Sequence, residues 1–101
     1  MKRALLYKLR FAPEIVSHLK ALGAGRQQQV IDAMKVQLLH EPAVATRNRK
    51  RLRPNPLAPW ELRVGTLRVF YDILDDEAVV EVVAIGEKDR ELRIAGKVVR
   101  L

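Results

Sequence analysis

The segment from Arg47 to Arg53 carries five positive charges in seven residues. Fixed positive charge at this density suits a phosphodiester partner, because guanidinium groups bind phosphate oxygens two at a time and the displaced counterions add to the affinity. Solvated loops also collect lysine and arginine, so this segment alone does not define a partner. Which partner this segment could bind depends on the residues that the fold places beside it.

Two further arginines fall on a predicted β-hairpin that turns at Gly65-Thr66. A two-residue turn there places Arg63 directly opposite Arg68, and strand alternation puts Glu61 on the same face. Like charges opposed across a ladder are normally destabilising, and the cost falls when an anion or Glu61 lies between them. Two interpretations follow: an anion-binding site, or two solvated arginines with Glu61 as their counter-charge on a sheet face that is open to water.

The same alternation assigns the other hairpin residues to the two faces of the sheet. Phe70 joins the arginine face, where it could stack on a nucleobase or be covered by a loop or a partner. The residues expected to face the core are Trp60, Leu62, Val64, Leu67, Val69 and Tyr71.

Two helices are predicted to precede this hairpin. Residues 3–10 can form a first strand, a helix follows from Pro13, and Gly23 and Gly25 are expected to end it in a tight turn. A second helix is expected over residues 26–39, where apolar residues recur at helical spacing. So short a turn between two helices predicts an antiparallel helical hairpin.

The second half of the chain is predicted to be mainly β. Residues 43–59 show little periodicity and contain three prolines, so we expect an ordered loop that crosses one side of the sheet. Strands are expected at residues 60–64, 67–74, 78–85, 92–94 and 98–101. The order β-α-α-β-β-β predicts a single α+β domain over residues 1–101, with an antiparallel twisted sheet and the helical hairpin on one face.

Composition limits the class of protein. With 101 residues, 49% of them hydrophobic and 31% charged, the chain can form one folded domain with a modest core. It lacks cysteine, which excludes disulfides and thiolate metal sites and fits a reducing cytoplasm. Charged residues follow the start too soon for a signal peptide, and no apolar run approaches the about 20 residues of a membrane helix. We therefore expect a cytoplasmic protein without membrane contact.

The net charge of +7 indicates an anionic partner, and its distribution makes the positive surface local. Eight acidic residues lie between Asp72 and Glu91, so the positive field comes mainly from the middle of the chain and the helices. His18 and His40 show no metal-ligand spacing. No metal or other cofactor is expected.

Three segments of the β half, taken in order, resemble a known family. They are LRVG at residues 62–65, LRVFY at 67–71 and VVEVVAIGEK at 79–88. Together they resemble the RelE/ParE superfamily of toxins from bacterial and archaeal type II toxin–antitoxin systems. NRKRL at 48–52 followed by PWELR at 59–63 is similar to one branch of it. The resemblance implies a RelE-like, microbial RNase-like fold. In RelE-type members it also implies mRNA cleavage in the ribosomal A site, by attack of a 2′-hydroxyl on the adjacent phosphate.

The resemblance also implies roles for individual residues. Arg68 matches the family's strand arginine, which is associated with phosphate stabilisation, and Lys88 falls where many RelE-type toxins carry a second arginine. The residues implied to hold the RNA backbone, without base specificity, are Lys50, Arg51, Arg53, Arg63 and Arg90.

One departure from the family concerns proton transfer. RelE-type toxins commonly carry a tyrosine or histidine near the C-terminus, and by spacing that position is Ile94 here. Isoleucine cannot transfer a proton, so Glu61, beside Arg63 and Arg68, is the candidate catalytic base. The alternative role for Glu61 is a salt bridge.

Three functions are compatible with these residues. The first is a toxin that cleaves mRNA on the ribosome and so inhibits translation. The second is a ParE-type inhibitor of DNA gyrase without nuclease activity, which would need no acid–base residue. The third is a degenerate, non-toxic relative. All three predict an acidic antitoxin protein as partner, neutralising the basic surface.

Overall fold

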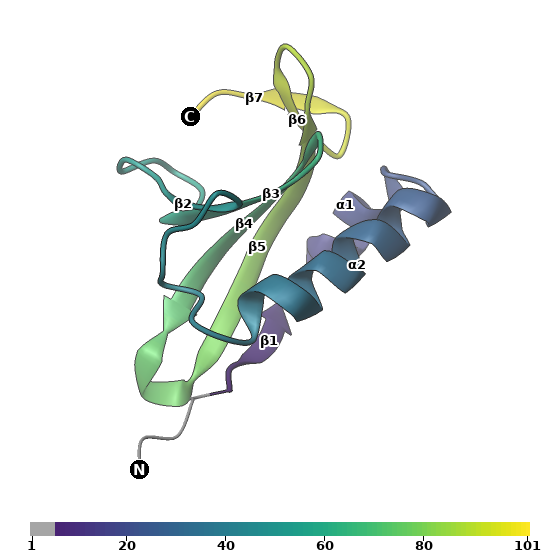
Figure 1. Cartoon of the computed structure of the whole chain (residues 1–101). Coiled ribbons are helices and arrows are strands. Elements are labelled where there is room, and N and C mark those ends of the chain that lie inside the picture. The colour runs from purple at the N-terminus through teal and green to yellow at the C-terminus, as the bar shows by residue number, and fades with distance from the viewer. Residues whose placement is uncertain (1–5) are drawn as a thin grey trace.

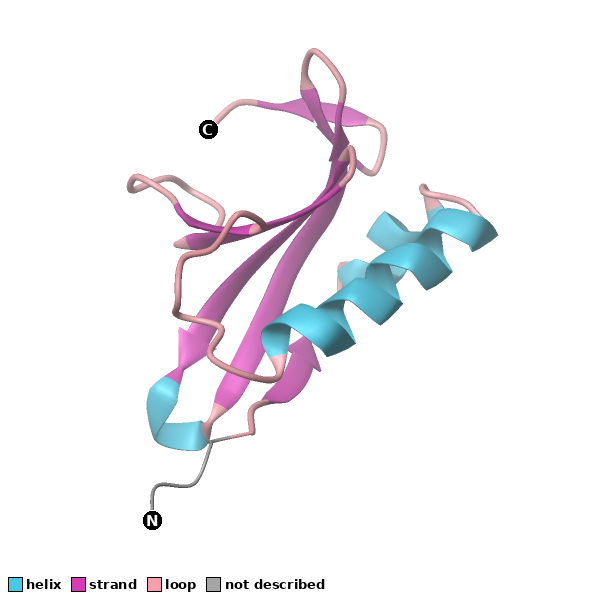
Figure 2. Cartoon of the chain, in the orientation of Figure 1, coloured by secondary structure: helices cyan, strands magenta, loops and turns pink. Residues whose placement is uncertain are grey.

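The computed structural model describes residues 6–101, and its first half holds one short strand and two helices (Figures 1 and 2). Strand β1 spans Lys8–Phe11, helix α1 Ile15–Lys20 and helix α2 Ala24–Leu38. The predicted first strand over 3–10 falls partly outside the described residues. Gly23 has φ +82° just before α2, as a tight turn requires, whereas Gly25 lies inside that helix.

The second half of the chain forms most of the sheet. The strands are β2 Arg49–Arg51, β3 Trp60–Val64, β4 Leu67–Leu74, β5 Val79–Lys88, β6 Leu92–Ile94 and β7 Lys97–Val99, with a 3₁₀ turn at Asp75–Glu77. They follow the order β2-β3-β4-β5-β6-β7 in antiparallel pairs, and this confirms the predicted α+β class. Strand β1 pairs with β5 in parallel, which corrects the wholly antiparallel prediction. The long connection between them, containing both helices, makes a parallel pair possible.

The central hairpin has the predicted register. Val64 pairs with Leu67 and Arg63 with Arg68, and the two-residue turn is made possible by Gly65 at φ +60°. The pairing continues to Trp60 and Tyr71, whose rings stack with centroids 6.0 Å apart. The predicted division of side chains between the two faces is therefore confirmed.

The helices cover one face of this sheet, as Figure 2 shows, and the main core lies between them. In the strands every second residue points into this core, and in α2 every third or fourth residue does. Side chains from α2 and the hairpin are therefore fully buried there. These residues are Val30, Met34, Leu38, Leu62, Val69 and Tyr71.

The opposite face carries a second, smaller core instead of open water. Phe70 is fully buried there among Ala58, Ala84, Leu92 and Ile94. Of the two alternatives for Phe70, the structure supports cover by a loop: the loop after β2 and strand β6 lie over it, and the ring is not open to a nucleobase. Strands β5 and β6 approach closely at Gly86, where a Cβ atom would collide with the Arg93 carbonyl and the Ile94 side chain. Only glycine fits between the two strands at that position.

The segment predicted as a loop over 43–59 contains the edge strand β2. Lys50 pairs with Glu61 and Arg51 with Trp60, so the cationic segment extends the sheet beside β3. Its anchor is Arg49, whose guanidinium donates to the carbonyl oxygens of Val44 at 2.9 Å and Gln37 at 2.7 Å. Within the described residues, neither helix is long and apolar enough to span a membrane.

Candidate phosphate-binding groove

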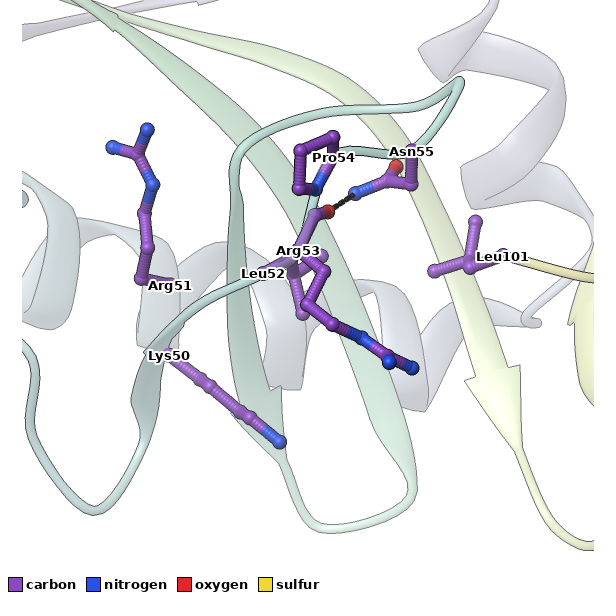
Figure 3. Close-up of a pocket in the computed structure, with 7 residues that line it drawn as sticks. All are labelled: Lys50, Arg51, Leu52, Arg53, Pro54, Asn55 and Leu101. Atoms are coloured by element: carbon purple, nitrogen blue, oxygen red, sulfur yellow. Dashed lines mark hydrogen bonds between the residues drawn. The ribbon is translucent and has the colours of Figure 1, made fainter.

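The first part of the candidate site is a hollow of ≈ 570 Å³ beside β2 and the loop that follows it (Figure 3). Lys50 and Arg53 extend toward the same side in this view, and Arg51 points the other way. The lining residues are Lys50, Arg51, Leu52, Arg53, Pro54, Asn55 and Leu101. Two of the three predicted backbone-binding residues of this segment therefore come together.

Strand alternation explains why Arg51 diverges. Lys50 pairs with Glu61 and shares its face of the sheet, so the next residue along β2 must point to the other face. There the Arg51 guanidinium lies 5.8 Å from the centroid of the Trp60 ring, within the range of a cation–π contact. Arg51 is predicted from sequence to bind phosphate, but the structure does not bring its charge together with those of Lys50 and Arg53.

The loop that presents Arg53 is held by the side chain of Asn55. Its Nδ2 donates to the carbonyl oxygens of Arg53 at 2.8 Å and Ala58 at 2.9 Å. Its Oδ1 accepts from the backbone amides of Leu57 at 2.8 Å and Ala58 at 3.1 Å. Four hydrogen bonds from one side chain fix a segment without regular secondary structure. The sequence analysis did not identify Asn55, although its place between Pro54 and Pro56 is typical of a turn.

The second part of the site is a hollow of ≈ 360 Å³ between the end of β5 and the C-terminal strands. It brings the predicted residues Glu61, Lys88 and Arg90 together with Arg100, which the sequence analysis missed. The remaining lining residues are Glu91, Leu92, Val98, Val99 and Leu101. The backbone amide of Lys88 donates to the Thr66 carbonyl at 2.7 Å, so the hairpin turn fixes the base of the Lys88 side chain.

Glu61 is the one buried charged residue of the described chain, with 6% of its surface exposed. Its Oε1 accepts a hydrogen bond from Arg63 Nε at 3.0 Å. The predicted salt bridge is therefore present, and the carboxylate also contributes to the wall of the second hollow. A buried carboxylate needs such a partner, because burying a charge without one is costly.

Arg63 and Arg68 are direct partners across the β3–β4 ladder, but they line neither hollow. The Arg68 guanidinium bends back over the turn, where Nη1 donates to the carbonyl oxygens of Gly65 at 2.7 Å and Leu67 at 2.9 Å. Its Nε is buried and has no hydrogen-bond partner among residues 6–101. Arg68 must leave these contacts before it can meet a phosphate in either hollow.

The histidine and tyrosine side chains among residues 6–101 line neither hollow. His18 Nδ1 accepts from the Ile85 amide at 3.2 Å, and burial lowers the pKa of this imidazole. Tyr71 donates its hydroxyl to the Pro42 carbonyl at 2.9 Å, and burial raises the pKa of its phenol well above the usual value. Ile94 is 7% exposed, inside the second core. Within the described part of the chain, no group of three or more acidic or histidine side chains is placed to hold a metal ion.

Comparison with known proteins identifies the class of this domain. The sequence model of the family described as "ParE toxin of type II toxin–antitoxin system" matches residues 9–92. Because this match spans most of the 101 residues, the chain belongs to that family and is the toxin of a type II toxin–antitoxin system. A search of the curated proteins finds no match.

A solved structure supports the fold. The toxin–antitoxin complex RelBE2 from Mycobacterium tuberculosis contains a chain that is 24% identical, with a TM-score of 0.73. The match covers 87% of this chain and 98% of the other. The fold is therefore RelE-like, as the sequence resemblance implied.

Proposed function

We propose that this toxin inhibits translation by cutting mRNA on the ribosome, as a single domain acting in the cytoplasm. The observation that carries the proposal is the second hollow, which is lined by Glu61 and by the cations Lys88 and Arg90. Lys50 and Arg53 line the adjoining hollow and would hold the RNA backbone, a contact that carries no base specificity.

The groups in this hollow match the demands of RNA cleavage by the 2′-hydroxyl. Glu61 would take the 2′-hydroxyl proton as the oxygen attacks the adjacent phosphorus, and Lys88 and Arg90 would stabilise the charge on the phosphorane. The P–O5′ bond then breaks, leaving a 2′,3′-cyclic phosphate and a 5′-hydroxyl end that receives a proton from Lys88 or water. Arg63 would hold the Glu61 carboxylate in place.

Arg68 has a conditional role in this proposal. Its family position associates it with phosphate stabilisation, and its guanidinium now binds the carbonyls of Gly65 and Leu67. A phosphate entering beside Glu61 would compete for that guanidinium as a charged acceptor, which forms stronger hydrogen bonds than a carbonyl. We infer that Arg68 rotates toward the RNA when substrate binds.

Inhibition of DNA gyrase is the second candidate function. The description of the matching family favours it, and so does Ile94, which occupies the expected acid–base position and packs in the second core. A toxin that acts by binding alone needs no proton-transfer group. In that case the cationic groove would serve as a binding surface rather than as a catalytic site.

An acidic antitoxin is the proposed partner under either function. The structural neighbour was solved as a toxin–antitoxin complex, and the cationic residues of the groove form a surface that an acidic segment would neutralise. Co-expression with the acidic product of a neighbouring gene tests this partner. Its co-purification with the toxin, lost at high salt, is the expected result.

Controlled expression without antitoxin tests the proposed function. Growth should stop, translation should fall, and plasmid supercoiling should stay normal while mRNA is cut. Loss of supercoiling with intact mRNA would establish gyrase inhibition instead. Normal growth at full expression would identify a non-toxic relative.

A further inference from the structure

The two hollows meet at the C-terminal end of the described chain. Arg100 and Leu101 follow β7, and both line the second hollow. Leu101 also lines the first hollow, and Figure 3 shows its side chain facing the loop that carries Arg53. These last residues therefore lie on the border between the two hollows.

The sheet joins the hollows at a second point. Lys50 of the first hollow and Glu61 of the second are Cα partners across β2 and β3, so they sit side by side on one face. The two hollows therefore share Leu101 and adjoin at this pair of residues.

Each hollow contains cationic residues. Lys50 and Arg53 lie in the first hollow, and Lys88, Arg90 and Arg100 lie in the second.

The acidic residues of the second hollow already have cationic neighbours. Glu61 is hydrogen-bonded to Arg63, and Glu91 lies 3.5 Å from the guanidinium of Arg93. The cations in the hollow therefore stay available for an anionic ligand.

Apolar residues also line the two hollows. Leu101 is 52% exposed there, and Leu52 and Val98 line the adjoining walls. A duplex keeps its bases stacked inside, whereas a single strand offers unstacked base faces to such a surface. A single strand can place phosphates in both hollows and an unstacked base on the apolar residues.

We propose that Arg100 completes a second phosphate subsite and that the two hollows form one groove for a single-stranded polynucleotide, with a base packed on Leu101. The proposal rests on the proposed action on RNA, and it adds residues and a binding mode that neither the family match nor the sequence analysis assigns.

Equilibrium binding tests it without any cleavage. The probe is a fluorescent decanucleotide RNA with 2′-O-methyl riboses, which cannot react, titrated by anisotropy over a range of salt concentrations. Arg100→Gln should weaken binding by about three- to tenfold at low salt and reduce the slope of log K against log salt by about 0.7, the value for one phosphate contact on a single strand. Lys97→Gln is the matched control: it removes an exposed charge from neighbouring β7 that lines neither hollow.

Leu101→Ser separates base packing from charge. It should weaken binding of the RNA and leave the affinity for inorganic polyphosphate unchanged.

Equal slopes for Arg100→Gln and wild type, or equal loss of affinity from Lys97→Gln, would overturn the second subsite. If the RNA binds in this Arg100-dependent way but mRNA stays intact in cells, the groove stands and the nuclease proposal fails. If mRNA is cut and Arg100→Gln binds the RNA like wild type, the nuclease proposal stands and the second phosphate subsite fails.

Discussion

Arg63 and Arg68 face each other across the β3–β4 ladder, and their guanidinium groups bind different partners. Arg63 binds the Glu61 carboxylate on its own strand, and Arg68 binds the carbonyls of the hairpin turn. Each charge therefore has a local partner, which explains how a like-charge pair persists in the sheet. Of the two interpretations of the pair, the one with Glu61 as counter-charge describes Arg63 in this structure.

Glu61→Gln separates the structural role of this carboxylate from its proposed catalytic role. The change keeps the side-chain size and removes the charge, so we expect the free energy of unfolding to fall by about 1 kcal/mol as one charge-assisted hydrogen bond weakens. mRNA cleavage should be lost. Urea unfolding and primer extension on a reporter mRNA measure the two effects, and a stable variant that cuts at the wild-type rate would leave Glu61 only its salt bridge.

Phe70→Ala tests the second core. Because Phe70 is fully buried under the loop and β6, its truncation should lower the free energy of unfolding by about 3–5 kcal/mol. Val36→Ala is the control, since Val36 lies on α2 and is 73% exposed. Urea titration followed by tryptophan fluorescence gives both values. Similar stability for the two variants would show that Phe70 is not packed as described.

Asn55→Asp probes the loop that carries Arg53. Aspartate keeps the oxygen that accepts from the Leu57 and Ala58 amides, and it loses the donor to the Arg53 and Ala58 carbonyls. Hydrogen exchange should therefore find those two amides still protected in Asn55→Asp and unprotected in Asn55→Ala. Protection that survives in the alanine variant would mean that another contact holds the loop.

His18 should make stability depend on pH. Burial lowers the pKa of His18, Glu14 acts in the opposite direction, and Nδ1 must be unprotonated to accept from the Ile85 amide. Because the folded-state pKa lies below the unfolded one of about 6.5, this contribution is complete above that pH and is lost as the pH falls toward the folded value. Urea unfolding can be measured from about pH 7.5 to about pH 5, a range that includes the unfolded-state pKa. Over this range the free energy of unfolding should decline less for His18→Gln than for wild type. Parallel declines would contradict it.

Local chemistry made the hairpin predictable. Gly65-Thr66 can form a two-residue turn, and that turn fixes which residues pair, so the register from Trp60 to Tyr71 followed from the sequence. The helical hairpin followed from apolar spacing around Gly23. These features depend on neighbours within a few residues, which sequence patterns represent well.

Features that depend on distant contacts were missed. Strand β2 has three residues, all cationic, and its pairing with β3 cannot be seen from its composition. The second core brings together Leu57, Phe70 and Ile94 from separate parts of the chain. Arg100 joins the site only because the C-terminal strands turn back over the sheet. Strand alternation turns the Arg51 side chain to the face opposite Lys50, which a run of cations in the sequence does not show.

Mapping the 5′ ends of cellular mRNA after induction of the toxin tests the central claim most directly. The account predicts new 5′-hydroxyl ends inside translated regions within minutes of induction, retained with Lys97→Gln and absent with Glu61→Gln. Growth arrest with no new mRNA ends would contradict it.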